Sequence, residues 1–205
     1  MTKESNVSWN NRIIKLDREK WQGHKFPFNY VSHYFYDIKV SHSGNDFQIT
    51  FVKRPFGVPY VNAPNDKDKL FQPWWDNVIA WGIIENERLI AAIETAVEEW
   101  SNRLIVTELW VDDAYRRQGI ATALMDIAMK RAKEEKRRVL MLETQSCNEG
   151  AIDFYLNYGF SLIGFDSCAY QNNDLDRKEV RMNMGIFLDN GEKKQLSNMI
   201  RLDAV

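Results

Sequence analysis

The turn Arg116-Arg117-Gln118-Gly119-Ile120-Ala121 constrains the fold of this chain more than any other segment. An apolar strand pattern from Leu104 to Val111 precedes it, and an amphipathic helix pattern from Ile120 to Lys136 follows it. The first N–H groups of a helix lack intrahelical acceptors, and the helix dipole favours an anion beside them. Gly119 has no side chain to keep an anion away, and Ala121 keeps the first helical turn small. The turn therefore predicts a phosphate cradle; the alternative is an Arg-rich surface turn without a ligand.

Two further elements follow this helix pattern. The run Val139 to Glu143 predicts a short buried strand, and the segment Asn148 to Tyr158 predicts a second helix that ends at Gly159. In the first helix, apolar side chains recur at intervals of three and four residues, which indicates one face packed on a sheet. This part of the chain therefore has the order strand, helix, strand, helix.

Together these segments resemble the GNAT superfamily of N-acetyltransferases, which transfer an acetyl group from acetyl-CoA to an amine. The resemblance implies acetyl-CoA as a cosubstrate. It also implies an α/β fold of the mixed α+β kind, in which helices flank a central mixed, mostly antiparallel sheet. The motifs that carry it are Arg-x-x-Gly-x-Ala at Arg116 to Ala121, the strand that ends in Glu143, the helix from Asn148 to Tyr155, and Tyr158-Gly159-Phe160.

A narrower likeness covers Trp100 to Leu188. The segment Leu142-Glu143-Thr144-Gln145 with Asn148, and the run Phe160 to Asp166 followed by Tyr170, are similar to streptothricin acetyltransferases. This likeness implies a small cationic acceptor, streptothricin, acetylated on its β-lysine moiety, and hence antibiotic resistance. Two other functions stay open. One is acetylation of a protein N-terminus, a lysine side chain or another small amine, and the other is a non-catalytic acyl-CoA-binding module.

The chain is expected to form one domain. A length of 205 residues allows one well-buried core, and 44% hydrophobic with 27% charged residues is typical of globular proteins. Residues 78–188 are the predicted acetyl-CoA-binding core. Residues 1–77 match no motif and are expected to belong to the same domain. Residues 189–205 are expected to form a polar tail or a short terminal helix.

Antiparallel strands are predicted on both sides of the strand, helix, strand, helix segment. The turn-rich segment 54–66 is expected to be irregular. A first strand is expected at Arg12 to Leu16. Hairpins are expected for Tyr34 to Val40 with Phe47 to Lys53, for Trp81 to Ile84 with Leu89 to Ile93, and for Ser161 to Tyr170 with Glu179 to Leu188.

Composition excludes several other functions. The formal net charge of -2 gives no basic field for nucleic acid. No apolar run approaches the roughly 18 residues that cross a bilayer, and the polar N-terminal segment lacks a signal-peptide core. We therefore expect a cytoplasmic protein without a membrane partner, and a homodimer stays open. Cys147 and Cys168 lack CxxC spacing, and His24, His33 and His42 form no ligand pattern with them, so reduced thiols and no metal site are predicted.

Acetyl transfer requires a neutral amine. Deprotonating a lysine-like amine of pKa near 10.4 at pH 7 costs about 4.6 kcal/mol, and a nearby carboxylate can accept the proton directly or through water. Glu143 is the predicted general base, because it ends a central strand where parallel neighbours diverge and ligands enter. The alternative for Glu143 is a carboxylate bonded to backbone amides. Glu108 is the rival base, on the strand expected to pair with the pantetheine arm of acetyl-CoA.

The departing thiolate requires an acid. Tyr155 is predicted to protonate it, since a phenol of pKa about 10 is a suitable acid toward a thiolate whose thiol has a pKa near 8.5. Asn148 lies two helical turns earlier and faces the same way. In the superfamily the Asn hydrogen-bonds the cofactor and the Tyr reaches its sulfur. The alternative for Tyr155 is a core tyrosine, because Ile152 and Leu156 share its helical face.

The remaining cofactor contacts are expected at the turn and on the strand before it. Backbone N–H groups near the end of this strand are expected to hold the thioester carbonyl. Arg116 fits the first position of the motif, whereas Arg117 stands where glycine is frequent, which predicts a stiffer turn that still binds phosphate. The expected contacts of acetyl-CoA are Leu109, Trp110, Val111, Arg116, Arg117, Gln118, Gly119, Ile120, Ala121, Thr122, Asn148 and Tyr155.

Acceptor recognition leaves weaker signals in the sequence. Several acidic residues lie on or near predicted strand ends, where together they would attract a cationic amine. For each of them alone, a solvated surface carboxylate is the alternative. These residues are Glu94, Glu98, Glu99, Asp112, Asp113, Asp166, Asp174 and Asp176.

Overall fold

The computed structural model describes residues 9–62 and 68–188. The tail expected for residues 189–205 lies outside them. The strands are β1 (Ile14–Lys15), β2 (Tyr30–Ser43), β3 (Asp46–Asn62), β4 (Ile79–Glu85), β5 (Arg88–Glu98), β6 (Arg103–Val111), β7 (Val139–Gln145), β8 (Ser161–Asp166) and β9 (Arg181–Phe187). The helices are α1 (Arg18–Trp21), α2 (Ile120–Glu134), α3 (Glu149–Tyr158) and α4 (Asp174–Arg177), with 3-10 turns at Trp9–Arg12, Glu99–Ser101 and Asp113–Tyr115.

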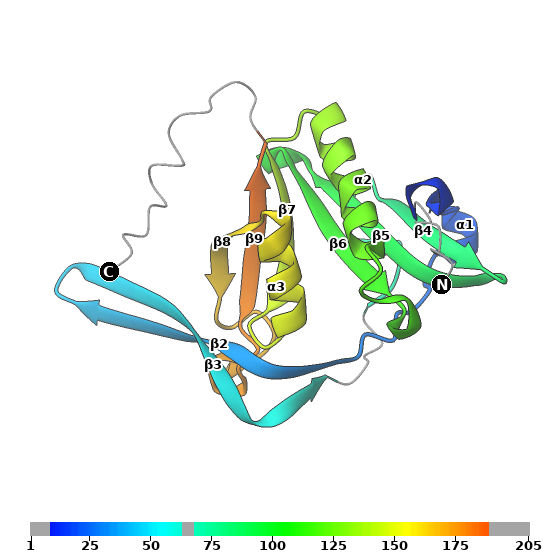
Figure 1. Ribbon diagram of the computed structural model, residues 1–205. Helices are drawn as coiled ribbons and strands as arrows, with labels where there is room; N and C mark the ends of the chain where they lie inside the picture. Colours follow the sequence, from blue (N-terminus) through cyan, green and yellow to red (C-terminus); the bar gives the residue numbers. More distant parts are fainter. Residues whose placement is uncertain (1–8, 63–67, 189–205) are drawn as a thin grey trace.

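Seven of the described strands form one sheet in the order β1-β4-β5-β6-β7-β9-β8. β6 and β7 run parallel, and every other neighbouring pair of this described sheet is antiparallel. The helix α2 connects the two parallel strands, because a parallel pair needs a crossover connection. Both α2 and α3 pack on the same face of the sheet (Figure 1). The predicted fold, a mixed and mostly antiparallel sheet flanked by helices, is confirmed.

Each face of the sheet has a buried core. On one face, Ile120 and Leu124 of α2 pack with apolar side chains of the central strands. On the other face, Leu16 and Phe26 from the N-terminal segment pack with Trp110 of β6. The N-terminal segment, in which the sequence shows no motif, thus covers the side of the sheet that the two long helices leave open.

A bulge interrupts the ladder between β5 and β6. Glu94 pairs with Glu108, but the next pair is Thr95 with Val106, so Thr107 is an extra residue on β6. Side chains alternate between the two faces of a strand, and one inserted residue reverses the alternation beyond it. Because of this insertion, Glu108 lies on the same face of the sheet as Glu94.

The parallel strands β6 and β7 separate toward their carboxyl ends. Their pairing runs from Arg103 with Val139 to Val106 with Leu142 and stops there. Beyond this point β6 continues to pair with β5, and β7 continues to pair with β9. The two strands therefore diverge just before Glu143, as the sequence predicts.

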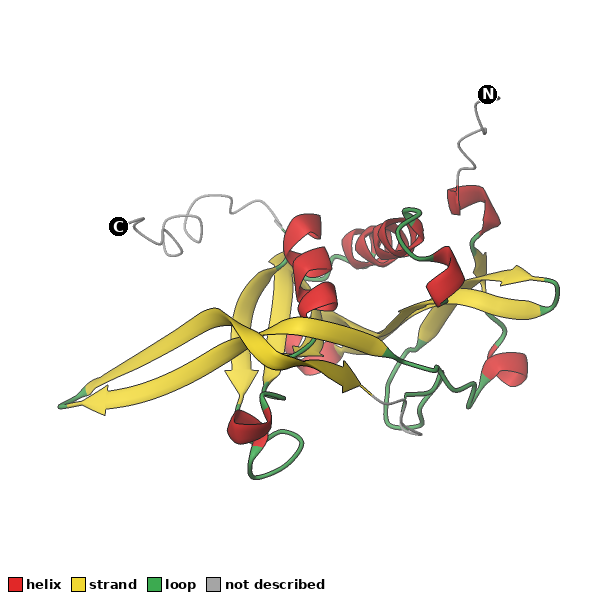
Figure 2. Ribbon diagram, turned by 60° about the horizontal axis from the view of Figure 1, so that its bottom comes forward, coloured by secondary structure: helices red, strands yellow, loops and turns green. Residues whose placement is uncertain are grey.

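β2 and β3 form a separate two-stranded ribbon, which extends well beyond the predicted hairpin (Figure 2). The prediction of irregular structure for segment 54–66 is wrong for residues 54–62, because β3 continues to Asn62; residues 63–66 lie outside the described residues. Pro55 and Pro59 are tolerated in this strand because the register of the ladder shifts opposite them.

The ribbon is anchored to the start of α3. The N–H of Tyr36 donates to the backbone oxygen of Ser146 at 2.9 Å. The carboxylate of Glu149, the first residue of α3, accepts from the backbone N–H groups of His33 and Tyr34 at 3.2 Å each. These bonds hold the base of the ribbon beside the end of β7.

Candidate active site

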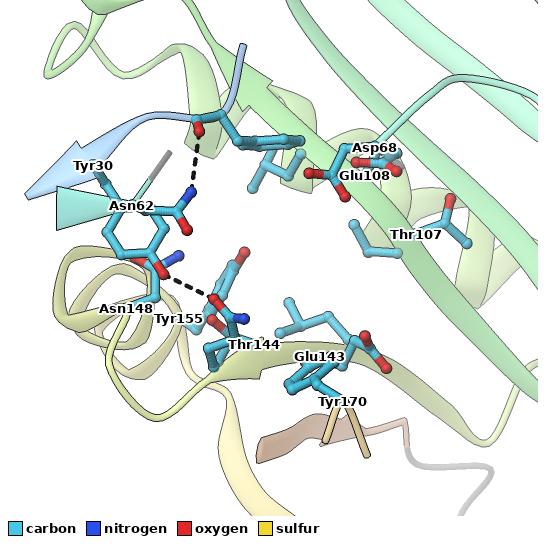
Figure 3. A pocket seen from close by; sticks show the side chains of 15 residues that line it. Tyr30, Asn62, Asp68, Thr107, Glu108, Glu143, Thr144, Asn148, Tyr155 and Tyr170 are labelled. Atoms are coloured by element: carbon cyan, nitrogen blue, oxygen red, sulfur yellow. Dashed lines mark hydrogen bonds between the residues drawn. The ribbon is translucent and has the colours of Figure 1, made fainter. Parts of the chain in front are cut away.

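The gap between β6 and β7 opens into a cavity of about 390 Å³, here called the central cavity (Figure 3). Both strands, the start of α3, the base of the ribbon and the segments before β4 and β9 contribute to its wall. The lining residues are Phe28, Tyr30, Asn62, Asp68, Val106, Thr107, Glu108, Leu109, Leu142, Glu143, Thr144, Gln145, Asn148, Tyr155 and Tyr170.

A second cavity, of about 270 Å³, lies at the start of α2 and is here called the turn cavity. The two cavities lie next to each other along β6 and α3. Leu109 and Tyr155 line the central cavity, whereas Val111 and Phe154, on the same strand and helix, line the turn cavity. A molecule bound at the turn can therefore extend along β6 to the central cavity. The turn cavity is lined by Val111, Tyr115, Arg116, Arg117, Gly119, Ile120, Ala121, Thr122 and Phe154.

The start of α2 has the geometry of an anion site. Gly119 is the N-cap residue, with a left-handed φ of 84°, and no side chain caps the helix. The first turn contains no acidic residue. A Cβ atom built on Gly119 meets no heavy atom within 4 Å, so the space in front of the helix is open. The amides at the start of the helix are thus accessible to an anion.

The two arginines of the turn differ in their roles. Arg117 has a φ of 61°, in the left-handed region that glycine adopts without strain. This explains why glycine is frequent at this position of the motif. Arg116 donates from Nε to Val111 O and from Nη2 to Asn29 O, each at 3.2 Å, and its Nη2 lies 2.7 Å from Asp113 Oδ1. Arg116 therefore fixes the turn to the end of β6, and contact of either arginine with a phosphate stays a prediction.

Three carboxylates line the central cavity: Asp68, Glu108 and Glu143 (Figure 3). Burial raises the pKa of Glu108 to about 9, and the negative charges of Asp68, Glu94 and Glu143 add to this increase. At neutral pH the Glu108 carboxyl group therefore holds a proton as long as no cation occupies the cavity.

Glu143 approaches the cavity from the opposite strand, β7. Its side chain is 53% exposed, and its Oε2 lies 3.6 Å from Nη1 of Arg181. Loss of surrounding water raises the pKa of Glu143 above its usual value, and the positive charge of Arg181 offsets part of this increase. The two candidate bases thus differ: Glu143 has a cation beside it, whereas Glu108 has other carboxylates as neighbours.

Tyr155 and Asn148 both line the central cavity. Tyr155 is 9% exposed, and burial followed by the charge of Glu108 raises its pKa. Its phenol therefore stays protonated at neutral pH, as a proton donor must. Asn148 is the N-cap residue of α3, and its Oδ1 accepts from the N–H of Ala151 at 3.3 Å. The cap fixes the start of the helix that carries Tyr155.

The N-terminal part of the chain supplies cavity residues that sequence reasoning missed. Tyr30 and Asn62, paired at the base of the ribbon, form one wall (Figure 3). The hydroxyl of Tyr30 donates to Gln145 Oε1 at 2.9 Å, and Nδ2 of Asn62 donates to Phe28 O at 3.1 Å. No motif marks Tyr30, Asn62 or Asp68, so only the folded arrangement identifies them.

None of the acidic residues proposed from strand positions for acceptor recognition lines the central cavity. Glu94 is fully buried, and Glu98 and Glu99 form ion pairs with Arg103 and Arg137. The acidic residues that do line the central cavity are Asp68 and the two candidate bases, Glu108 and Glu143. The remaining candidates have other partners. Backbone N–H groups donate to Asp112, Asp166 and Asp174. Asp113 and Asp166 form ion pairs with arginines, and Asp176 lies in α4.

The cysteine thiols are not activated. Cys147 is buried, and burial raises its pKa to about 11, so little of it is thiolate at neutral pH. Both Cys147 and Cys168 are free thiols. Across the described residues, no group of three or more His, Cys, Asp or Glu side chains could hold a metal ion. No helix within residues 9–62 and 68–188 is long and apolar enough to span a membrane.

Replacing Glu108 by glutamine is expected to stabilise the unliganded protein increasingly as the pH rises. Folding raises the pKa of Glu108 from 4.5 to about 9, so the folded state binds this proton more tightly than the unfolded state. The wild-type protein therefore loses stability as the pH rises between these values, and the glutamine variant does not. Thermal unfolding near pH 5 and near pH 9 measures the effect. Glu134→Gln, at an exposed position of α2, is the control, and an equal pH dependence in the wild type and Glu108→Gln would contradict the assignment.

The chain belongs to the acetyltransferase (GNAT) family, whose model matches residues 49–160. This match covers the turn, both predicted helices and the diverging strands. The resemblance inferred from the turn, Glu143 and the helix from Asn148 to Tyr155 is thereby confirmed.

Comparison with individual proteins shows which members of this family the chain is similar to. The chain is 36% identical over 73 residues to streptothricin acetyltransferase A of Bacillus subtilis (strain 168), a match that covers 36% of this chain and 42% of that protein. It is 24% identical over 147 residues to a streptothricin acetyltransferase of Escherichia coli, covering 72% of this chain and 79% of that protein. A Bacillus anthracis str. Ames protein solved in complex with acetyl coenzyme A shares the fold, with 23% identity, a TM-score of 0.66, and coverage of 86% of this chain and 98% of that one.

Proposed function

We propose that this chain transfers an acetyl group from acetyl-CoA to a primary amine of a small, multiply charged cation, and that streptothricin is this acceptor. One observation carries the proposal. Tyr155 lines a cavity with three carboxylates, and the adjacent residue on the helix, Phe154, lines the turn cavity, where the amides at the start of α2 are accessible. A cation and an anionic carrier can thus meet at a protonated phenol. The cytoplasmic location predicted from the sequence is part of this proposal.

The shape of the donor site supports acetyl-CoA. Its pyrophosphate fits the accessible amides at the start of α2. Its pantetheine arm is an extended amide chain, and none of the described strands pairs with β6 on its β7 side beyond Val106. The backbone groups of Leu109 to Val111 on this side can pair with the arm as an added strand would. The similar Bacillus anthracis protein was solved with acetyl coenzyme A, which supports the same donor here.

The charge of the central cavity supports a cationic acceptor. Three carboxylates in one cavity repel one another, and this repulsion contributes to the raised pKa of Glu108. An ammonium group that enters the cavity relieves the repulsion and favours the ionised form of Glu108. A substrate with several charged amines is attracted to this cavity more strongly than a substrate with one amine.

The general base is one of the two glutamates at the diverging strands. Glu143 is our first assignment, because Arg181 favours its ionised, proton-accepting form. Glu108 is the alternative, since it becomes a base once a bound cation has displaced its proton. Either carboxylate accepts the proton of the ammonium group, directly or through water, and leaves a neutral amine.

Tyr155 completes the reaction as the acid. The neutral amine attacks the thioester carbonyl, a C–N bond forms and the C–S bond breaks. The departing sulfur then takes the phenolic proton of Tyr155. The nitrogen of the new amide loses its extra proton to the resulting phenolate, directly or through water, and this transfer is favoured because burial raises the pKa of Tyr155 above its usual value. N–H groups on the open edge of β6 are placed to stabilise the negative charge that develops on the carbonyl oxygen.

Thiol release from acetyl-CoA is expected to be far faster with streptothricin than with free lysine or a peptide N-terminus. The KM for streptothricin is expected to rise with ionic strength, because salt screens attraction between exposed charges over about 8 to 10 Å near physiological strength. Purified protein assayed with the three amines at low and high salt tests this.

The same assay separates the other candidate functions. Turnover of peptides but not of streptothricin would make the protein an acetyltransferase of a different acceptor class. Binding of acetyl-CoA without thiol release to any amine would indicate an acyl-CoA-binding module. Cells that express the chain are also expected to tolerate more streptothricin than cells that express the Tyr155→Phe variant.

A further inference from the structure

Glu94 is a buried carboxylate that the proposed reaction does not use. It lies in the middle of β5 with 0% exposure, and it is not among the residues that line the central cavity. Its Oε1 accepts from the hydroxyl of Thr107 at 2.8 Å, and its Oε2 accepts from the N–H of Phe71 at 2.5 Å. Burying a carboxylate costs free energy unless it is well hydrogen-bonded, so these two partners explain how it is retained.

The first partner is the residue that makes the bulge. Thr107 is the extra residue of β6, which the β5 ladder leaves without a cross-strand partner. Its hydrogen bond to Glu94 ties this extra residue to β5. If the bulge were lost, Glu108 would point to the opposite face of the sheet. The backbone N–H and C=O groups that follow it would also reverse their directions. The hydrogen bond between Glu94 and Thr107 thus holds the geometry of the open end of β6.

The second partner belongs to the segment that carries Asp68. Phe71 has a left-handed φ of 59°, which a non-glycine residue adopts only where its surroundings hold it. The hydrogen bond from its N–H to Glu94 is one such constraint. Asp68, three residues earlier, accepts on its backbone oxygen from the N–H of Phe26 at 3.1 Å and lines the cavity. One carboxylate therefore joins the two segments that bring Asp68 and Glu108 together.

We propose that Glu94 is a positioning residue for acetyl transfer: through Thr107 it fixes the bulge that directs Glu108 into the central cavity, and through Phe71 it holds the segment with Asp68. This inference rests on the proposed function. Glu94 contacts neither substrate, and it acts by fixing the positions of the carboxylates that line the central cavity. The negative charge of Glu94 also acts on Glu108, as do those of Asp68 from the segment before β4 and Glu143 from β7. The phenol of Tyr155 from α3 faces Glu108 as well.

Two substitutions of Thr107 isolate the hydrogen bond. Thr107→Val keeps the shape of the side chain and removes the hydroxyl, so Glu94 loses a partner. Thr107→Ser keeps the hydroxyl and removes a methyl group. We expect kcat/KM for the amine to fall about tenfold or more in Thr107→Val and to fall clearly less in Thr107→Ser, which keeps the hydrogen bond to Glu94. Equal activity of the valine variant and the wild type would overturn the inference, as would equal losses in the valine and serine variants.

A second measurement does not depend on activity. Glu94→Gln removes one negative charge that faces Glu108, so the pKa of Glu108 should fall and its ionisation should cost less stability. The gain in melting temperature from Glu108→Gln near pH 9 is therefore expected to be smaller in the Glu94→Gln background than in the wild type. Glu98→Gln, at the end of the same strand, is the matched control background. An undiminished gain in melting temperature would overturn the inference, and this measurement does not require catalysis. Failure to acetylate any amine would instead refute the proposed function.

Discussion

Replacement of Gly119 by glutamate is expected to abolish acetyl-CoA binding, with a loss of affinity of at least about a hundredfold, because like charges brought together cost several kcal/mol. The new carboxylate would enter the open space before α2, where the accessible amides are expected to bind the pyrophosphate. The left-handed φ of 84° at this position adds backbone strain for any residue except glycine. Titration calorimetry with acetyl-CoA measures the effect directly.

Gly119→Gln is the matched control for this change. Glutamine has nearly the same size and shape as glutamate, meets the same backbone strain at this position, and carries no charge. It should therefore bind acetyl-CoA more tightly than the glutamate variant, and the difference between them reports electrostatic repulsion. Normal affinity in a folded Gly119→Glu protein would remove the phosphate cradle from the mechanism.

Tyr155→Phe is expected to lower turnover by about 10²-fold or more while acetyl-CoA affinity stays nearly unchanged. The side chain is 9% exposed and contacts the core through its ring, so phenylalanine fills the same space and only the proton donor is lost. Steady-state kinetics with saturating amine measures turnover, and calorimetry measures donor affinity.

Tyr158→Phe provides the control on the same helix. The hydroxyl of Tyr158 donates to Asp126 at 2.7 Å, away from the residues that line the central cavity. Its removal should leave turnover close to that of the wild type. If Tyr155→Phe and Tyr158→Phe have equal turnover, Tyr155 is a core tyrosine and another group must protonate the sulfur.

The predictable parts of this fold are those whose causes are local. The turn before α2 depends on Gly119, which has a φ of 84°. The sequence indicates this position as a glycine immediately before the helix pattern that starts at Ile120. α3 begins at the cap residue Asn148 and ends at Gly159, which has a φ of 112°. Both signals lie within a few residues of the structure that they determine.

The parts that sequence reasoning missed depend on contacts between distant segments. Asp68 and Tyr30 reach the central cavity only because the N-terminal segment and the ribbon fold against the open end of the sheet. Glu94 has the sequence context of a strand-end carboxylate open to cations, yet it is buried because the bulge and Phe71 provide its hydrogen bonds. The alternating strand pattern of β6 also cannot show that one residue is inserted at Thr107.

The ribbon of β2 and β3 has a ladder of its own, separate from the ladder of the main sheet. It supplies Tyr30 and Asn62 to the acceptor wall, while Gly119 and Tyr155 are held by α2 and α3. We therefore expect changes at the base of the ribbon to alter the choice of amine without moving the donor machinery. A substitution at Tyr30 or Asn62 therefore changes one wall of the central cavity and leaves the hydrogen-bond ladder of the main sheet intact.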